Sequence, residues 1–240
     1  MGVVVEVDRV SKVYELGGQM FQALKSVSLA IEEGVFMAIA GPSGSGKTSL
    51  LNLIGCIDTP SGGRILIDGV DVAGKSADEL ADLRNRTIGF IFQTFNLLPV
   101  LSAAENVEYP LLRRNDLTAA ERRARVKHFL NLVGLSNFGG RRPNQLSGGQ
   151  RQRVAIARAL AVEPRIVLAD EPTANLDRKT GDEILKLMRS LNKQLGTTFI
   201  FSTHDKRVMA MADRLVRISD GELTLLGVRT ADRWAYVKAR

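Results

Sequence analysis

The stretch Ala40-Gly41-Pro42-Ser43-Gly44-Ser45-Gly46-Lys47-Thr48-Ser49 decides the fold, because it fits the phosphate-loop pattern G-x-x-x-x-G-K-[ST] at every fixed position. The apolar residues 35–40 before it are typical of a buried strand, and the apolar residues 49–54 after it indicate a helix. Strand, loop and helix in this order are the context in which the pattern binds phosphate. The stretch therefore predicts a nucleotide site, because a plain strand-to-helix turn has no use for this order of glycines, lysine and hydroxyl.

The residue types of this loop fit phosphate chemistry. Glycines leave space for backbone N–H groups to point at phosphate oxygens, and the following helix offers unpaired N–H groups and the positive end of its dipole. We expect Lys47 to reach the outer phosphates and the Thr48 hydroxyl to ligate Mg²⁺. The predicted nucleotide-binding residues of the loop are Gly41, Pro42, Ser43, Gly44, Ser45, Gly46, Lys47, Thr48 and Ser49.

Composition limits the class of protein. The chain has 240 residues, of which 45% are hydrophobic and 25% charged, as in an ordinary globular protein. No apolar run approaches about 18 residues, the length of a membrane span, and Glu6, Asp8 and Arg9 lie where a secretory signal would be apolar. We therefore expect a cytosolic protein, in which the single Cys56 is a small core residue without a disulfide.

The net charge of +7 favours anionic partners, which include nucleotides, nucleic acids and acidic lipid surfaces. Charge alone does not choose among them. The arginines are scattered over residues 84–153 without the interleaved aromatic side chains that stack on bases, so a solvated basic surface is the favoured interpretation. We expect no nucleic-acid partner.

Two later segments carry related chemistry. Ser147 is a natural N-cap, and Gly148 and Gly149 in the next turn open backbone N–H groups to an anion. Residues 166–171 form a buried strand that ends in two adjacent carboxylates, at the edge where open parallel sheets place their ligands. Two exposed acids at a strand end would suffice without a phosphate loop upstream. With one, we expect Asp170 on the Mg²⁺ side and Glu171 as a base for water.

Two single residues carry weaker signals. His204 follows the strand 198–201 and is expected at the same sheet edge as Lys47, although a lone histidine is more often structural than catalytic. Tyr14 could stack on a base face or pack at a sheet edge, and from the residue alone packing is the favoured interpretation.

Hydrophobic periodicity supplies the remaining architecture. Strands are expected at residues 3–7, 27–31, 64–67, 88–92, 198–201, 215–218 and 222–225, with a turn at Gly17-Gly18 between the first two. Residues 93–162 are expected to be helical, with helices that begin near Ser102 and, through a capping box, at Thr118. A further helix runs from Asp177 to Gly196. These patterns predict an α/β protein with a parallel sheet, a front antiparallel sheet and an all-helical insertion.

Taken together, the motifs resemble the ordered set of an ABC-transporter ATPase subunit. They are residues 41–48, Gln93, residues 146–150, residues 166–171, residues 175–177 and His204. The resemblance covers nearly the whole chain and implies a P-loop NTPase core. It implies one ABC ATPase domain over residues 1–240, with 1–92 and 163–240 as the core with its β-subdomain and 93–162 as the helical subdomain.

The resemblance also implies roles for individual residues. Tyr14 would stack on adenine, and Gln93 would sense Mg²⁺ and the attacking water. The implied catalytic residues are Lys47, Gln93, Glu171 and His204, the last in contact with the γ-phosphate, and the implied metal-binding residues are Thr48, Gln93 and Asp170. The signature residues Ser147, Gly148, Gly149 and Gln150 would bind ATP held by a second copy of the chain, and Asp177 would cross the dimer contact.

Within that superfamily, residues 41–55, 89–99 and 170–177 are similar to the lipoprotein-releasing and macrolide-export group. The implied function is to bind and hydrolyse ATP with Mg²⁺ and to power a separate integral-membrane permease, for export or for extraction of a lipid-linked or amphiphilic substrate. The implied assembly is a homodimer closed by ATP, peripheral to the cytoplasmic side of the inner membrane. The sequence does not name the substrate.

Other functions fit parts of the sequence. A small-molecule kinase could use the phosphate loop alone, but the second phosphate-facing helix start at Ser147 speaks against it. A cytosolic ABC ATPase that acts on nucleic acid or ribosomes usually has a long coiled coil before the signature or two ATPase domains in one chain, and this chain has neither. The apolar loop 95–101 either packs under the helical subdomain or is part of a surface that binds a short helix of a permease.

Overall fold

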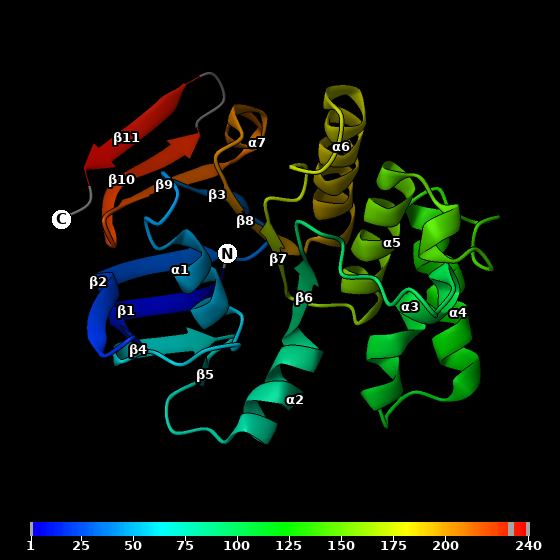
Figure 1. Ribbon diagram of the computed structural model, residues 1–240, viewed down its shortest axis with the longest axis horizontal. Helices are drawn as coiled ribbons and strands as arrows, with labels where there is room; N and C mark the ends of the chain where they lie inside the picture. The colour runs from blue at the N-terminus through cyan, green and yellow to red at the C-terminus, as the bar shows by residue number, and fades with distance from the viewer. Residues whose placement is uncertain (1, 230–232, 239–240) are drawn as a thin grey trace.

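The computed structural model describes residues 2–229 and 233–238, which fold around two sheets (Figure 1). The antiparallel four-stranded sheet has the order β2-β1-β4-β5, and the seven-stranded sheet has the order β11-β10-β9-β3-β8-β7-β6. Their strands are β1 (Val3–Leu16), β2 (Gln19–Glu32), β3 (Phe36–Ala40), β4 (Gly62–Ile67), β5 (Val70–Asp71), β6 (Ile88–Ile91), β7 (Ile166–Asp170), β8 (Thr198–Thr203), β9 (Arg214–Ser219), β10 (Glu222–Arg229) and β11 (Trp234–Lys238). Strands β6, β7, β8, β3 and β9 pair in parallel, which confirms the predicted α/β class with a front antiparallel sheet.

The helices begin where the sequence places capping residues. Ser76, Ser102, Thr118 and Ser147 each close a capping box with the residue three positions later, and Asp177 caps α6. The helices are α1 (Lys47–Ile54), α2 (Ala77–Thr87), α3 (Ala103–Glu108), α4 (Ala119–Leu132), α5 (Gly148–Ala161), α6 (Arg178–Leu195) and α7 (Lys206–Met211), with 3₁₀ turns η1 (Tyr109–Arg113) and η2 (Pro143–Gln145). Helix α6 ends at Gly196 in the left-handed conformation, as predicted.

The central sheet is apolar on both faces, so each face needs a cover. In β3, Phe36 and Ala38 belong to one buried cluster and Met37 and Ile39 to another, because side chains alternate along a strand. The cluster of Met37 and Ile39 includes α1, which lies between the two sheets, whereas the cluster of Phe36 includes α5 and α6. This arrangement places α1, and the loop before it, at the meeting point of both sheets.

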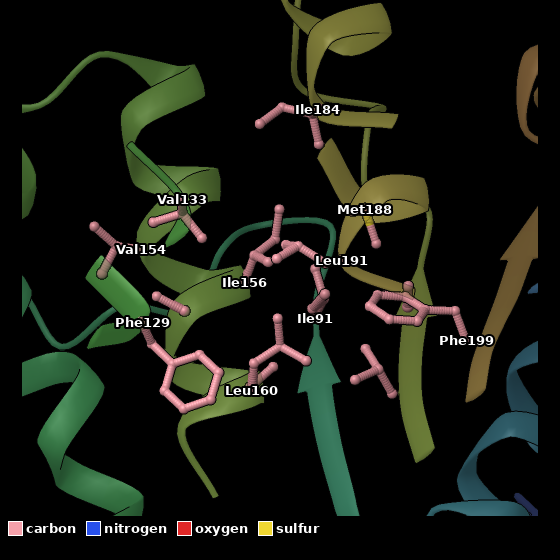
Figure 2. Close-up of a cluster of buried hydrophobic side chains, with 14 of the residues drawn as sticks. Ile91, Phe129, Val133, Val154, Ile156, Leu160, Ile184, Met188, Leu191 and Phe199 are labelled. Carbon is pink, nitrogen blue, oxygen red and sulfur yellow. The ribbon is translucent and has the colours of Figure 1, made fainter. Parts of the chain in front are cut away.

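Helix α5 is shared between the central sheet and the group of α3, η1 and α4. Figure 2 shows its Val154, Ile156 and Leu160 among side chains from α4, α6, β6 and β8. One buried cluster therefore runs through the helical region and into the central sheet. The division of the chain at residues 93 and 162 stays a prediction, because no separate core marks it among the described residues.

Several elements differ from the expectation. Strands β1 and β2 are fourteen residues each, longer than 3–7 and 27–31, because their far ends form an exposed hairpin with register shifts that blur the period-two pattern. Helices α2 and α7 and strand β11 were not predicted. None of the helices in the described part of the chain combines the length and the apolar character that crossing a membrane requires.

Candidate nucleotide site

The predicted site residues leave one edge of the central sheet. Strand β3 pairs with β8, β8 with β7 and β7 with β6, all in parallel, so their carboxyl ends lie in a row. The segments that follow these four strands carry, in that order, Lys47, His204, Glu171 and Gln93. Sheet register thus brings together four residues that are far apart in sequence.

The phosphate loop turns directly into α1. Gly46, the residue before the helix, has φ of 102°, and a Cβ at this position would lie 2.5 Å from the carbonyl oxygen of Ala23. The Nζ of Lys47 donates to the carbonyl oxygens of Gly41 and Pro42, both at 2.8 Å, so the ammonium group lies over the loop. No side chain of residues 2–229 and 233–238 caps α1, and its first N–H groups therefore face the loop without a side-chain acceptor among them.

These features fit a bound phosphate group. The loop carries the buried Oγ of Ser45, which has no hydrogen-bond partner among the described residues, the uncapped start of α1 and the Lys47 ammonium. A phosphate oxygen accepts hydrogen bonds from all three kinds of donor. The loop therefore has the donors, the positive charge and the open backbone that an anion requires.

The same edge fits a hard divalent cation. Thr48, a hydroxyl residue in the first turn of α1, and Gln93, an amide residue after β6, are exposed residues, and Asp170 ends β7. Oxygen donors of these types suit Mg²⁺, which takes further ligands from phosphates and water. Residues 2–229 and 233–238 contain no cluster of three or more His, Cys, Asp or Glu that could hold a metal.

The two adjacent carboxylates have different surroundings. Burial raises the pKa of Asp170 above its ordinary value of 3.8, the Glu171 charge raises it further, and the Lys47 ammonium opposes both. Glu171 has φ of 44°, a strained conformation for this residue, and its backbone N–H donates to the carbonyl of Ser202 on β8 at 3.0 Å. The turn aims the Glu171 side chain toward the end of β8.

Glu171 and His204 form a direct pair that the sequence did not reveal. The Nδ1 of His204 lies 2.6 Å from Oε1 of Glu171, and the His204 backbone N–H donates to the same oxygen at 3.1 Å. Thr203 Oγ1 donates to Oε2 at 3.3 Å. Because a carboxylate accepts hydrogen bonds, Nδ1 is the donor of this pair, and the His204 side chain that carries it is 76% exposed.

Asn175 connects two segments of the edge. Its Nδ2 donates to the carbonyl oxygen of Gln93 at 2.9 Å, which joins the segment after β7 to the segment after β6. Sequence reasoning named residues 175–177 as a motif but assigned Asn175 no contact. The motif's position after the carboxylates was the available signal.

Tyr14 lies in β1 beside the start of α1. Its hydroxyl donates to Asp58 at 2.9 Å, and the Nζ of Lys12 lies 4.8 Å from the ring centroid and donates to Asp58 at 2.6 Å. Burial raises the pKa of Tyr14, and its hydrogen bond to the Ser49 side chain opposes this shift. Lys12 and Asp58 belong to no local motif, so the sequence did not indicate them. The base-stacking role of Tyr14 stays a prediction.

The signature residues lie elsewhere, at the start of α5. The Ser147 hydroxyl accepts from the Gln150 N–H at 3.2 Å, and the Gln150 side chain accepts from the Ser147 N–H at 2.9 Å. A Cβ on Gly148 would lie 3.4 Å from Leu176, and a Cβ on Gly149 would lie 2.6 Å from Cγ2 of Thr180. The contacts of these glycines are thus with the segment that enters α6, and Ser147 is exposed.

Comparison with known proteins agrees with this geometry. A family model described as ABC transporter matches residues 24–174. The chain is 47% identical over 223 residues to the lipoprotein-releasing system ATP-binding protein LolD of Anaeromyxobacter dehalogenans, covering 93% of each chain. It is 48% identical over 219 residues to the macrolide export ATP-binding/permease protein MacB of Brucella melitensis, covering 91% of this chain and 34% of that protein. The fold matches a dimeric post-hydrolysis structure of the ATP-binding cassette MJ0796 bound to ADP and Pi, with a TM-score of 0.84, 44% identity and coverage of 98% and 100%.

Proposed function

The chain belongs to the ABC transporter family of ATP-binding proteins, and from this premise we propose that its ATP is hydrolysed at the sheet edge that carries Lys47, His204, Glu171 and Gln93. The protein is an ATP-binding subunit with ATP hydrolase activity. The observation that carries the proposal is the hydrogen-bonded pair of Glu171 and His204 at the same edge as the open N-terminus of α1. This edge combines groups that can bind phosphate with a carboxylate positioned to act as a base.

The chemistry divides among the residues of the edge. Lys47 and the open N–H groups of the loop and α1 bind the outer phosphates and stabilise their negative charge. Glu171 accepts a proton from the attacking water, while His204 orients the carboxylate through Nδ1. His204 reaches the γ-phosphate as a donor in its imidazolium form, in which Nε2 also carries a proton. Thr48, Gln93 and Asp170 are the residues that would hold Mg²⁺, which neutralises phosphate charge when bound. Tyr14 provides an aromatic face for adenine.

Replacement of Glu171 tests the proposed base. Glu171→Gln should retain ATP binding and slow steady-state hydrolysis by on the order of a hundredfold or more, because the amide cannot accept the proton. Phosphate release and ATP titration calorimetry measure the two effects. Glu183→Gln, at an exposed position on α6, is the matched control and should hydrolyse ATP at the wild-type rate. Wild-type hydrolysis by Glu171→Gln would remove that residue from the base role.

The active assembly is proposed to be a homodimer closed by ATP. Ser147 is exposed, so a phosphate can reach this helix start from outside the chain. The matched structures include a dimeric cassette that holds ADP and Pi. In the proposed dimer, residues 147–150 of one copy face the phosphate loop of the other, with Asp177 at the contact.

A permease on a separate chain is the proposed membrane partner, which would place this subunit on the cytoplasmic side of the membrane. LolD is by name the ATP-binding protein of a lipoprotein-releasing system, and MacB joins an ATP-binding part and a permease in one chain. We propose a related task, export or extraction of a lipid-linked or amphiphilic substrate. The related proteins are transporter components, which favours this task over action on nucleic acid or ribosomes.

The proposed docking surface is a groove of about 390 Å³ between the end of β6 and η1. It is lined by aromatic and apolar residues together with arginines, among them Arg84, Phe90, Phe92, Tyr109 and Arg113. The apolar loop beside it divides into two kinds of residue: Leu97 packs against the buried cluster, whereas Leu98 is 37% and Val100 is 73% exposed. Internal packing thus accounts for Leu97, and permease docking for the exposed pair.

Substitution of Leu98 or Leu97 by glutamate distinguishes a docking residue from a residue that packs inside the subunit. Leu98→Glu should leave thermal stability and basal hydrolysis of the isolated subunit unchanged and abolish its co-purification with the partner permease. Leu97→Glu should lower the unfolding temperature, because it buries a charge against the apolar cluster. A Leu98→Glu protein that unfolds as early as Leu97→Glu would remove Leu98 from the docking surface.

A further inference from the structure

The loop after Gln93 holds an unusual backbone conformation. Phe95 has φ of 63° and Asn96 has φ of 47°, so two consecutive non-glycine residues are left-handed. Asn tolerates this region, but a bulky residue such as Phe adopts it only when its surroundings enforce it. The internal hydrogen bonds of the loop are short-range, from Phe95 N–H to Phe92 and from Asn96 N–H to Thr94. The enforcing contacts must come from another element.

Those contacts come from α5. The guanidinium of Arg158 donates from Nη1 to the Asn96 carbonyl at 2.5 Å and from Nη2 to the Phe95 carbonyl at 2.9 Å. Arg151, two helical turns earlier on the same face, has its guanidinium carbon 5.4 Å from the centroid of the Phe95 ring. Each of the two strained residues is therefore held by an arginine of α5.

Arg158 is committed to these carbonyls. Burial lowers its pKa, and in residues 2–229 and 233–238 it forms no ion pair with a carboxylate. A planar guanidinium can satisfy two adjacent carbonyl oxygens at once, which a single-point ammonium does less well. Within the described part of the chain, the side-chain hydrogen bonds of Arg158 go to the loop that begins at Gln93.

We propose that Arg158 is a positioning residue that ties the loop after Gln93 to α5. The position of Gln93 then depends on the position of α5, the helix that begins with the signature residues. This inference rests on the proposed role of Gln93 at the hydrolytic edge. Asn175 donates to the Gln93 carbonyl oxygen at 2.9 Å from the segment after β7. The hydrogen bonds of Arg158 go to Phe95 and Asn96 and not to the phosphate loop, so the arrangement predicts a role in turnover rather than in ATP binding. Arg158 also lines the proposed permease groove, where an occupant would meet the same side chain.

The test compares Arg158→Ala with Arg153→Ala in the full-length protein. Arg153 is the matched control because it lies on the same helix and donates to a backbone carbonyl, that of Val133 at 2.8 Å, away from the loop. For Arg158→Ala we expect kcat to fall about tenfold to a hundredfold, as for a misplaced catalytic group, with KM for ATP within about twofold of wild type. Arg153→Ala should leave both constants within about twofold, and Arg158→Lys should fall between wild type and Arg158→Ala.

Hydrogen exchange without nucleotide provides a readout apart from activity. Amides of residues 93–98 should exchange faster in Arg158→Ala and at the wild-type rate in Arg153→Ala, because only the first change frees the strained loop. Equal exchange of residues 93–98 in the two variants, or an unchanged kcat in Arg158→Ala, would overturn the inference. Hydrolysis at the wild-type rate by Glu171→Gln would instead overturn the proposed hydrolytic edge. The exchange result would still test whether Arg158 holds the loop against α5.

Discussion

Two helix starts in this chain are rich in glycine, yet they differ in how their N–H groups are satisfied. Helix α1 follows the left-handed Gly46 and has no side-chain cap, whereas α5 follows Ser147, which forms a capping box with Gln150. The first can bind the phosphate of a nucleotide held by the same chain. The second is already stabilised by its own residues, and in the proposed dimer it meets a phosphate from another copy. Glycine at a helix start therefore does not by itself distinguish a ligand site from a capped helix.

The most severe loss is expected from the open helix start. Lys47→Ala removes the ammonium group that lies over the loop, so ATP binding should weaken and hydrolysis should fall by on the order of a hundredfold or more. Titration calorimetry and phosphate release measure the two losses. Lys186→Ala, an exposed lysine on α6, serves as the control. Wild-type ATP affinity in a folded Lys47→Ala protein would contradict the assigned grip on phosphate.

The capped helix start should matter to hydrolysis only across the dimer. Lys47→Ala and Ser147→Arg subunits should each be inactive alone, but a mixed dimer has one site with Lys47 from one chain and Ser147 from the other. Random mixing should restore about a quarter of wild-type hydrolysis, because half of the dimers are mixed and each has one intact site of two. A verified mixed dimer that neither hydrolyses ATP nor traps nucleotide at a single site would contradict the shared site.

The smallest effect concerns stability without nucleotide. Ser147→Ala should lower the free energy of unfolding by about 1 kcal/mol, because it removes the hydroxyl that caps α5. Ser45→Ala in the open loop should cause no loss, because its buried Oγ has no hydrogen-bond partner to give up. Urea unfolding of both variants measures the difference. Equal destabilisation would mean that the two helix starts do not differ in the way the hydrogen bonds indicate.

Sequence predicted the elements whose signals are local and regular. The helix starts at Ser102, Thr118 and Ser147 were predicted, the one at Thr118 through its capping box, whereas α2 carried the same signal at Ser76 and Glu79 without being recognised. Strands β1 and β2 were underestimated because their exposed halves alternate weakly and contain register shifts. Helix α7 spans only six residues, too few for a helical period to emerge.

Local pattern was sufficient for the phosphate loop, the order of motifs and the sheet edge at which they end, because consecutive residues and strand polarity dictate all three. The pairings within the site needed the packed fold. Glu171 meets His204 33 residues away, Tyr14 meets Asp58 44 residues away, and Arg158 reaches Asn96 62 residues away. Hydrogen bonds near 3 Å require backbones placed to within a fraction of that distance. Sheet register and helix packing provide this placement, and no short stretch of sequence determines either of them.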